Sequence, residues 1–164
     1  MKTLKRSLTT PFQSQLSKGF FIFLFVTALV GFADASYLTV EHYAHQIPPC
    51  AIGSCETVLS SSYSVVAGVP VALGGALYYL TILVLLMLYR DTKNEKILRA
   101  ALAFTLVGFL FSVYFFIIQA FVLHAFCQYC LGSAFTSTTL FIVAIVIFKK
   151  YSPQEIAGNT CPLT

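Results

Sequence analysis

Four cysteines form two close pairs, and their spacing is the first chemical signal in this sequence. Cys50 and Cys55 lie in the segment PPCAIGSCE, and Cys127 and Cys130 form the C-x-x-C segment FCQYC. C-x-x-C spacing at a helix start lowers a thiol pKa, and the thiolate is the form that attacks disulfides. The two pairs therefore predict thiol–disulfide exchange, in which electrons pass from Cys50/Cys55 to Cys127/Cys130.

The chain that carries these pairs has the composition of a membrane protein. Of its 164 residues, 58% are hydrophobic and 10% are charged, whereas about a quarter of the residues in a soluble domain are charged. Crossing a bilayer takes about 20 apolar residues, and four stretches meet that need: 19–40, 69–89, 100–123 and 125–148. We predict an all-α membrane protein, a four-transmembrane-helix bundle with a cysteine-bearing extracytoplasmic loop between the first two helices.

The positive charges predict the topology of that bundle. All ten Lys and Arg residues lie within residues 2–18, 90–99 and 149–150. By the positive-inside rule, both termini and the turn at 90–99 are then cytoplasmic. We expect residues 1–18 and 149–164 to be cytoplasmic tails on a redox domain at 19–148. A nucleic-acid partner would need a basic patch on a folded domain, and the charges form none.

The first 35 residues also fit a second interpretation. They resemble a signal peptide that ends at the segment ADA, with a basic start and an apolar core. The apolar run continues past Ala35 through Val40, which favours a membrane anchor. Cleavage would leave the other spans on the same sides.

This topology puts all four paired cysteines on one side of the membrane. In a bacterial inner membrane that is the oxidising side, where disulfides form and persist, while Cys161 falls on the reducing side in the C-terminal tail. Cys127 and Cys130 lie one turn apart near a helix start, where unpaired N–H groups favour a thiolate. The molecule that accepts electrons from that pair must be soluble in the bilayer, so a membrane quinone is the expected acceptor.

The sequence resembles the vitamin K epoxide reductase family in its bacterial form. The resemblance covers roughly residues 20–148 and rests on PPCAIGSCETVLSSSYSVVAGVPVALGGALYY, on FCQYCLG, and on the order of the cysteines among four helices. It implies that Cys50 meets a soluble partner, that Cys55 exchanges with Cys127, and that Cys130 faces the quinone. The family's loop Ser or Thr corresponds to Ser61.

The resemblance also implies a partner and an acceptor. Many bacterial relatives carry a fused thioredoxin-like domain, and this sequence ends without one, so we expect a separate thioredoxin-like periplasmic protein. The loop pair is spaced more closely than is usual, and Pro70 and Ala134 stand where vertebrate members have Asn and Tyr. Those polar groups help to hold the oxygens of vitamin K epoxide, so ubiquinone or menaquinone is the expected substrate. The alternative within the family is an enzyme whose main product is the reduced quinone or vitamin K.

A zinc site is the alternative from another class. The cysteine spacings fit a tetrathiolate site, and His42, His45 and His124 share the cysteines' side of the membrane. We predict no metal, because an oxidising compartment opposes four free thiolates.

The remaining candidates lie within the spans. Asp34 interrupts the first span, and a carboxyl there is costly enough to indicate a function. Aromatic residues are the candidates for the quinone pocket, chiefly Tyr78 and Tyr114 and, with less support, Tyr79, Phe115 and Phe116. We expect Gly74 and Gly75 to allow close helix packing.

Overall fold

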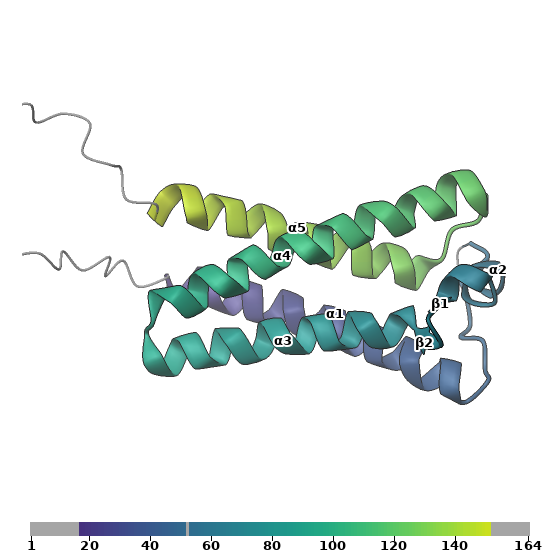
Figure 1. Ribbon diagram of the computed structural model, residues 1–164, viewed down its shortest axis with the longest axis horizontal. Helices are drawn as coiled ribbons and strands as arrows, with labels where there is room; N and C mark the ends of the chain where they lie inside the picture. The colour runs from purple at the N-terminus through teal and green to yellow at the C-terminus, as the bar shows by residue number, and fades with distance from the viewer. Residues whose placement is uncertain (1–16, 52, 152–164) are drawn as a thin grey trace, which may run out of the picture.

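The four predicted spans are helices that pack as an elongated bundle (Figure 1). The computed structural model describes residues 17–51 and 53–151. In these residues, four helices are long and apolar enough to cross a membrane: α1 (Lys18–Tyr43), α3 (Val71–Thr92), α4 (Glu95–Ile117) and α5 (Gln128–Tyr151). The predicted four-helix membrane bundle is confirmed. Most of both predicted tails, with Cys161, falls outside the described residues.

The helix boundaries differ from the predicted ones where the chain reverses direction. Val69–Pro70 forms strand β2, which pairs with β1 (Val65–Val66), so α3 begins two residues later than predicted. After α4 a π-helical turn, Ile118–Val122, continues the third span. The fourth helix begins at Gln128 instead of residue 125, because His124 has a left-handed backbone with φ of 47° and Cys127 pairs with the loop.

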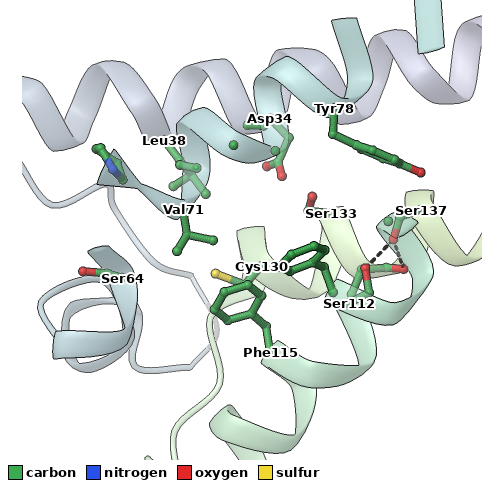
Figure 2. Close-up of a pocket in the computed structure, with 18 of the residues that line it drawn as sticks. Asp34, Leu38, Ser64, Val71, Tyr78, Ser112, Phe115, Cys130, Ser133 and Ser137 are labelled. Atoms are coloured by element: carbon green, nitrogen blue, oxygen red, sulfur yellow. Dashed lines mark hydrogen bonds between the residues drawn. The ribbon is translucent and has the colours of Figure 1, made fainter. Parts of the chain in front are cut away.

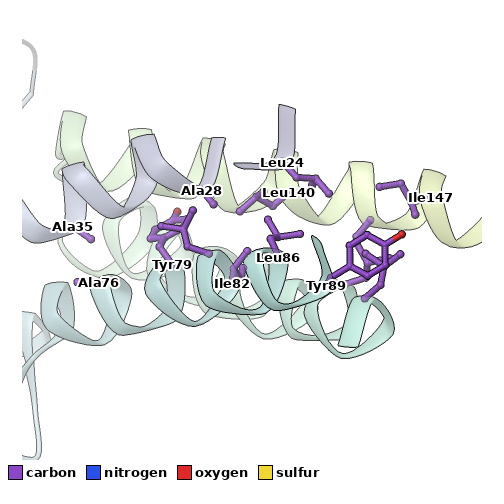
Figure 3. Close-up of a cluster of buried hydrophobic side chains, with 14 residues drawn as sticks. Leu24, Ala28, Ala35, Ala76, Tyr79, Ile82, Leu86, Tyr89, Leu140 and Ile147 are labelled. Atoms are coloured by element: carbon purple, nitrogen blue, oxygen red, sulfur yellow. The ribbon is translucent and has the colours of Figure 1, made fainter. Parts of the chain in front are cut away.

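Each long helix packs against two others. α1 contacts α3 and α5, and α4 also contacts α3 and α5. Figure 3 shows the buried side chains between them, among which Leu24, Ile82, Leu86, Leu140 and Ile147 are almost fully enclosed. Large apolar side chains are also exposed along all four helices, as expected where lipid surrounds a bundle.

Two glycines allow the closest helix approaches, and they are not the predicted ones. A Cβ at Gly31 would overlap the Tyr79 ring, and a Cβ at Gly108 would overlap the Tyr78 ring. Gly75 has ordinary contact with Ala35, and Gly74 has nothing within 4 Å. The expectation is wrong for Gly74, which lines a cavity, whereas Gly75 lies against α1 but has room for a Cβ.

The bundle has two unlike ends. At the hairpin end, α3 and α4 are joined through Lys93, which has a left-handed backbone, and Asn94, which caps α4 by accepting a hydrogen bond from the Lys96 N–H. At the cysteine end, α1 ends, α3 and α5 begin, and the loop, described at residues 44–51 and 53–70, lies over the helix ends (Figure 1).

Candidate functional site

The loop at the cysteine end carries a disulfide between Cys50 and Cys55. Their Cα atoms are 6.0 Å apart, a separation typical of disulfides. Cys55 begins the short helix α2 (Cys55–Leu59), with Ser54 at its N-cap position. The Ser54 side chain makes no capping bond, so the placement of α2 depends on other contacts.

Backbone pairing with the start of α5 supplies those contacts. Gly53 and Cys127 form an antiparallel bridge, and the Ser54 N–H donates to the Phe126 carbonyl over 2.9 Å. Tyr129 Oη donates to the Pro49 carbonyl at 3.1 Å. Gly53 has φ of +95°, and any Cβ there would overlap the Phe126 carbonyl oxygen. This position therefore requires glycine, for both conformation and space.

The pairing brings two of the four cysteines into one buried cluster. Cys55 is 1% exposed and Cys127 is 0% exposed, and they lie in a cluster with Val58 and Ala125. Cys130 is partly buried and packs against this cluster. The loop cysteine nearer α5 is thus packed with the first helix cysteine, which is the arrangement that exchange between them needs.

Gln119 fixes the position of Cys127 and was not singled out from the sequence. Its Oε1 accepts a hydrogen bond from the Cys127 N–H at 2.9 Å, and its backbone carbonyl accepts one from the Ala125 N–H at 3.1 Å. The side chain is 4% exposed. The sequence signal for this residue is a glutamine within an uncharged, mostly apolar span, because a buried amide needs hydrogen-bond partners.

The Cys127 thiol is activated where it lies. A hydrogen bond from the Cys130 thiol, aided by the N–H groups of Cys130 and Tyr129, lowers the pKa of Cys127 to about 7 despite its burial. These N–H groups belong to the first turn of α5, where they have no helical acceptor. Cys127 is therefore substantially thiolate near neutral pH, which suits the attacking sulfur of an exchange reaction.

A cavity of about 570 Å³ opens between the helices below the loop (Figure 2). Cys130 lies on its wall, and Cys127 does not. The predicted residues Ser61 and Tyr78 also line the cavity, as do several other predicted residues: Asp34, Tyr79, Phe115 and Phe116. The cavity thus joins the deeper cysteine of α5 to the apolar interior of the bundle.

Tyr114 does not line this cavity. Its side chain is 53% exposed and meets Phe115 edge-on. Successive residues on a helix point about 100° apart. Tyr114 is therefore directed outward from the bundle, whereas its neighbour Phe115 is directed inward. The expectation that Tyr114 lines the quinone pocket does not fit this cavity, and of the two predicted tyrosines Tyr78 alone lines it.

Two polar atoms in the cavity wall have no partner. Asp34 Oδ2 and Tyr78 Oη are both buried without a hydrogen bond in the described structure. Tyr79 differs, because its hydroxyl is hydrogen-bonded to the Ser133 carbonyl at 2.8 Å and to Thr136 Oγ1 at 2.7 Å. A mostly apolar cavity with a few unsatisfied polar groups is typical of a small-molecule site.

Ser61 connects the loop to the cavity. Its hydroxyl donates to the Val58 carbonyl at 2.7 Å at the end of α2, and its carbonyl accepts from the Ser64 hydroxyl at 2.8 Å. The neighbouring Ser60 makes an equivalent bond to the Glu56 carbonyl but does not line the cavity.

The zinc alternative gains no support from the geometry. Within residues 17–51 and 53–151, no group of three or more His, Cys, Asp or Glu side chains is placed to hold a metal ion. Cys50 and Cys55 are joined to each other, and His45 and His124 are exposed at turns.

Comparison with known proteins agrees with this geometry. The model of the vitamin K epoxide reductase family matches residues 22–145. The chain belongs to the vitamin K epoxide reductase family. No curated protein sequence matches the chain significantly. Membership of the vitamin K epoxide reductase family indicates an integral membrane oxidoreductase, and proteins of this family generally use a quinone.

Proposed function

We propose that this protein oxidises the dithiol of a thioredoxin-like partner and passes the electrons through its two cysteine pairs to a membrane quinone. One observation carries the proposal. Cys127 lies in one buried cluster with the loop cysteine Cys55, whereas Cys130, three residues further along the chain, opens on the cavity. One pair thus has a sulfur facing the loop and a sulfur facing the interior of the bundle.

The proposed reaction has three balanced steps. The partner dithiol reduces the Cys50–Cys55 disulfide and leaves as a disulfide. The loop dithiol then reduces a Cys127–Cys130 disulfide, and the loop disulfide forms again. Finally the helix dithiol gives two electrons and two protons to the quinone, which leaves as a quinol while the helix disulfide forms.

The redox potentials favour electron flow in this direction. Thioredoxin-like dithiols have potentials of about −120 to −270 mV, and each ~30 mV of difference is worth about 1.4 kcal/mol for two electrons. Respiratory quinones are generally more oxidising than these dithiols, so transfer to quinone is downhill. The net product in the cell is disulfide bonds in secreted proteins.

The partner would enter at Cys50. This residue follows Pro48 and Pro49 in an extended segment and is partly exposed, whereas Cys55 is enclosed. An attacking thiolate must reach the sulfur in line with the disulfide, so the accessible sulfur is the one that a protein partner attacks. The enclosed sulfur is left to exchange with Cys127.

The charges support a sidedness for this reaction. Basic residues gather at the hairpin end and at the chain termini, and by the positive-inside rule this favours a cysteine end outside the cytoplasm. After reduction, a membrane-impermeant maleimide should label an accessible cysteine of the loop pair from outside in intact cells, and should not label Cys161. External labelling of Cys161 would contradict this topology.

Anaerobic mixing tests the reaction itself. Purified protein is mixed with a reduced thioredoxin-like protein and a soluble quinone, and the quinone absorbance is followed. We expect quinone reduction that matches the partner thiols oxidised and that disappears in the Cys127→Ala and Cys130→Ala proteins. Quinone reduction that persists without these cysteines, or no reduction by the wild type, would refute the proposal.

A further inference from the structure

Asp34 is a carboxyl in the middle of an apolar helix that the relay of cysteines does not use. Its Oδ2 atom is buried and has no hydrogen-bond partner, and no basic side chain in the described residues forms an ion pair with it. A carboxylate in a membrane segment is costly, and such residues commonly serve a substrate or proton path. The unsatisfied oxygen therefore indicates a group that acts when the cavity is filled.

Asp34 lies on the wall of the same cavity as Cys130. On α1, residues Asp34, Leu38 and His42 recur every four positions and all line the cavity. Figure 2 shows the Asp34 carboxyl directed into the space whose opposite wall carries Cys130 and Ser133. It is near enough to interact electrostatically with the Cys127 and Cys130 thiols. A planar molecule held against Cys130 would thus meet this carboxyl.

Quinone reduction in such a cavity needs an acid. The quinone oxygens gain negative charge as electrons arrive, and a charge that is neither paired nor hydrogen-bonded is expensive in apolar surroundings. Among the described residues that line the cavity, Asp34 has the only carboxyl. Ser112 and Ser137 already bond to each other, and Tyr78 has a phenol, an ordinarily much weaker acid.

We propose that Asp34 is the proton-transfer residue of the quinone site, donating a hydrogen bond to a quinone oxygen and then its proton. The inference rests on the proposed function and adds a catalytic residue to it. As the Cys127–Cys130 bond forms, the two thiols lose two electrons and two protons, and the quinone gains both. Asp34 gives its own proton to one oxygen and takes up one thiol proton, so it ends the cycle unchanged.

The test compares substitutions that separate proton transfer from hydrogen bonding. In Asp34→Asn, the amide keeps the size and a donor N–H but has no transferable proton. We expect kcat for quinone reduction to fall about 100-fold, within the range for general acid catalysis, with little change in KM. Asp34→Glu keeps the acid and should recover part of the rate. Thiol exchange between the reduced partner and the loop disulfide, measured without quinone, should stay as in the wild type.

Thr39→Ala is the matched control on the same helix. The Thr39 hydroxyl bonds to the Ala35 carbonyl at 2.7 Å, and the residue does not line the cavity, so this variant should turn over as the wild type does. Wild-type rates in Asp34→Asn, with quinone reduction intact, would overturn the role of Asp34 and leave the proposed function standing. Absence of quinone reduction by the wild type would instead remove the proposed function and this inference with it.

Discussion

The two ends of the bundle are built from the same four helices, and they differ in what fills the space between them. At the hairpin end, Leu24, Leu86 and Ile147 are almost fully buried and close the interior (Figure 3). At the cysteine end, the interior is the cavity of about 570 Å³, with Asp34 and Tyr78 carrying unpaired polar atoms. One end therefore supplies packing free energy, and the other leaves room and polar groups for a ligand.

The difference follows from side-chain size and from the loop. The cavity wall includes Gly74, Gly75 and Ala134, whose small side chains leave space. The loop is held to α5 by backbone bonds at Gly53 and Ser54 and by one tyrosine, with little apolar burial besides the cysteine cluster. We expect substitutions at the cysteine end to change rates, and substitutions at the hairpin end to change stability.

Cys130→Ala is the largest expected effect at the cysteine end. Without this thiol the electrons have no route into the cavity, so quinone reduction should be lost completely while the protein stays folded. The Cys127 thiolate can then attack Cys55 in the loop disulfide and release Cys50 as a thiolate. The resulting Cys55–Cys127 disulfide should accumulate, because the helix thiol that would resolve it is missing. Mass spectrometry of the isolated protein would detect the Cys55–Cys127 disulfide.

The reciprocal trap defines the order in the loop. In Cys55→Ala, the reduced partner should stay joined to Cys50 as a mixed disulfide. A partner found joined to Cys55 in the Cys50→Ala protein, and never to Cys50, would show that the order is reversed.

Gly53→Ala should separate the loop from α5. The added Cβ overlaps the Phe126 carbonyl oxygen, so the bridge to Cys127 must open and Cys55 must move away from its partner thiol. We expect exchange between the two pairs to slow at least tenfold, because misplacement of reacting groups by about 1 Å can cost about 100-fold. Stopped-flow mixing with a reduced partner measures this step.

Gly68→Ala is the control for backbone conformation. Gly68 also has a positive φ, of +80°, but nothing lies within 4 Å of its added Cβ. Both variants carry the conformational cost of about 1 kcal/mol, and only Gly53→Ala breaks the pairing. Equal slowing in the two variants would mean that loop strain, and not the bridge, controls exchange.

The thiolate at Cys127 predicts a pH dependence confined to the cysteine end. Because its pKa is about 7 and lower than usual, the thiolate of the reduced helix pair increases as pH rises through 7. Attack by Cys127 on the loop disulfide, the reverse of the proposed exchange step, should therefore slow about tenfold per pH unit well below pH 7. The midpoint of the Cys127 titration is measured by the ultraviolet absorbance of the thiolate, in reduced protein that lacks Cys50 and Cys55. The absorbance of a matched protein that also carries Cys127→Ala is subtracted. Since the Cys130 hydrogen bond is the largest cause, Cys130→Ala should raise the midpoint. An unchanged midpoint would contradict that cause.

Leu86→Ala tests the hairpin end. This side chain is 1% exposed in the core, and its truncation should lower the free energy of unfolding in detergent by about 3 kcal/mol. The rate of quinone reduction, measured where the protein is still folded, should not change. A specific loss of rate in the folded variant would show that the two ends are coupled and would break the comparison.

The sequence was sufficient to predict the bundle, because apolar length and charge position depend on the bilayer and not on tertiary detail. The start of α5 was not predictable, since residues 125–127 belong by hydropathy to the helix. The left-handed backbone of His124 and the pairing of Cys127 with Gly53 exclude these residues from it.

The details of the site depended on contacts that no local pattern encodes. Gly31 and Gly108 look no different in sequence from Gly74 and Gly75, yet only the first two lie against tyrosine rings. Tyr78 and Tyr114 are equally plausible aromatic residues until the rotation of each helix in the bundle is known. Asp34 was detectable as an anomaly, because its cost in a membrane depends on residue type alone. Its position on the wall of the same cavity as Cys130 was not predictable.

Ser61→Ala is the smallest effect we predict, and it tests how far the site extends into the loop. The hydroxyl of Ser61 ties the end of α2 to the cavity rim through the Val58 carbonyl. Ser60 makes an equivalent bond at 2.6 Å on the exposed side, so Ser60→Ala removes a similar interaction away from the cavity. One such bond contributes about 1 kcal/mol. Its loss would therefore change the fraction of molecules that have an ordered cavity rim by about fivefold at most. We expect Ser61→Ala to slow quinone reduction about two- to fivefold by this reasoning, and Ser60→Ala to leave it unchanged. Equal rates for the two variants would mean that the loop only carries the cysteines and that the site ends at the helices.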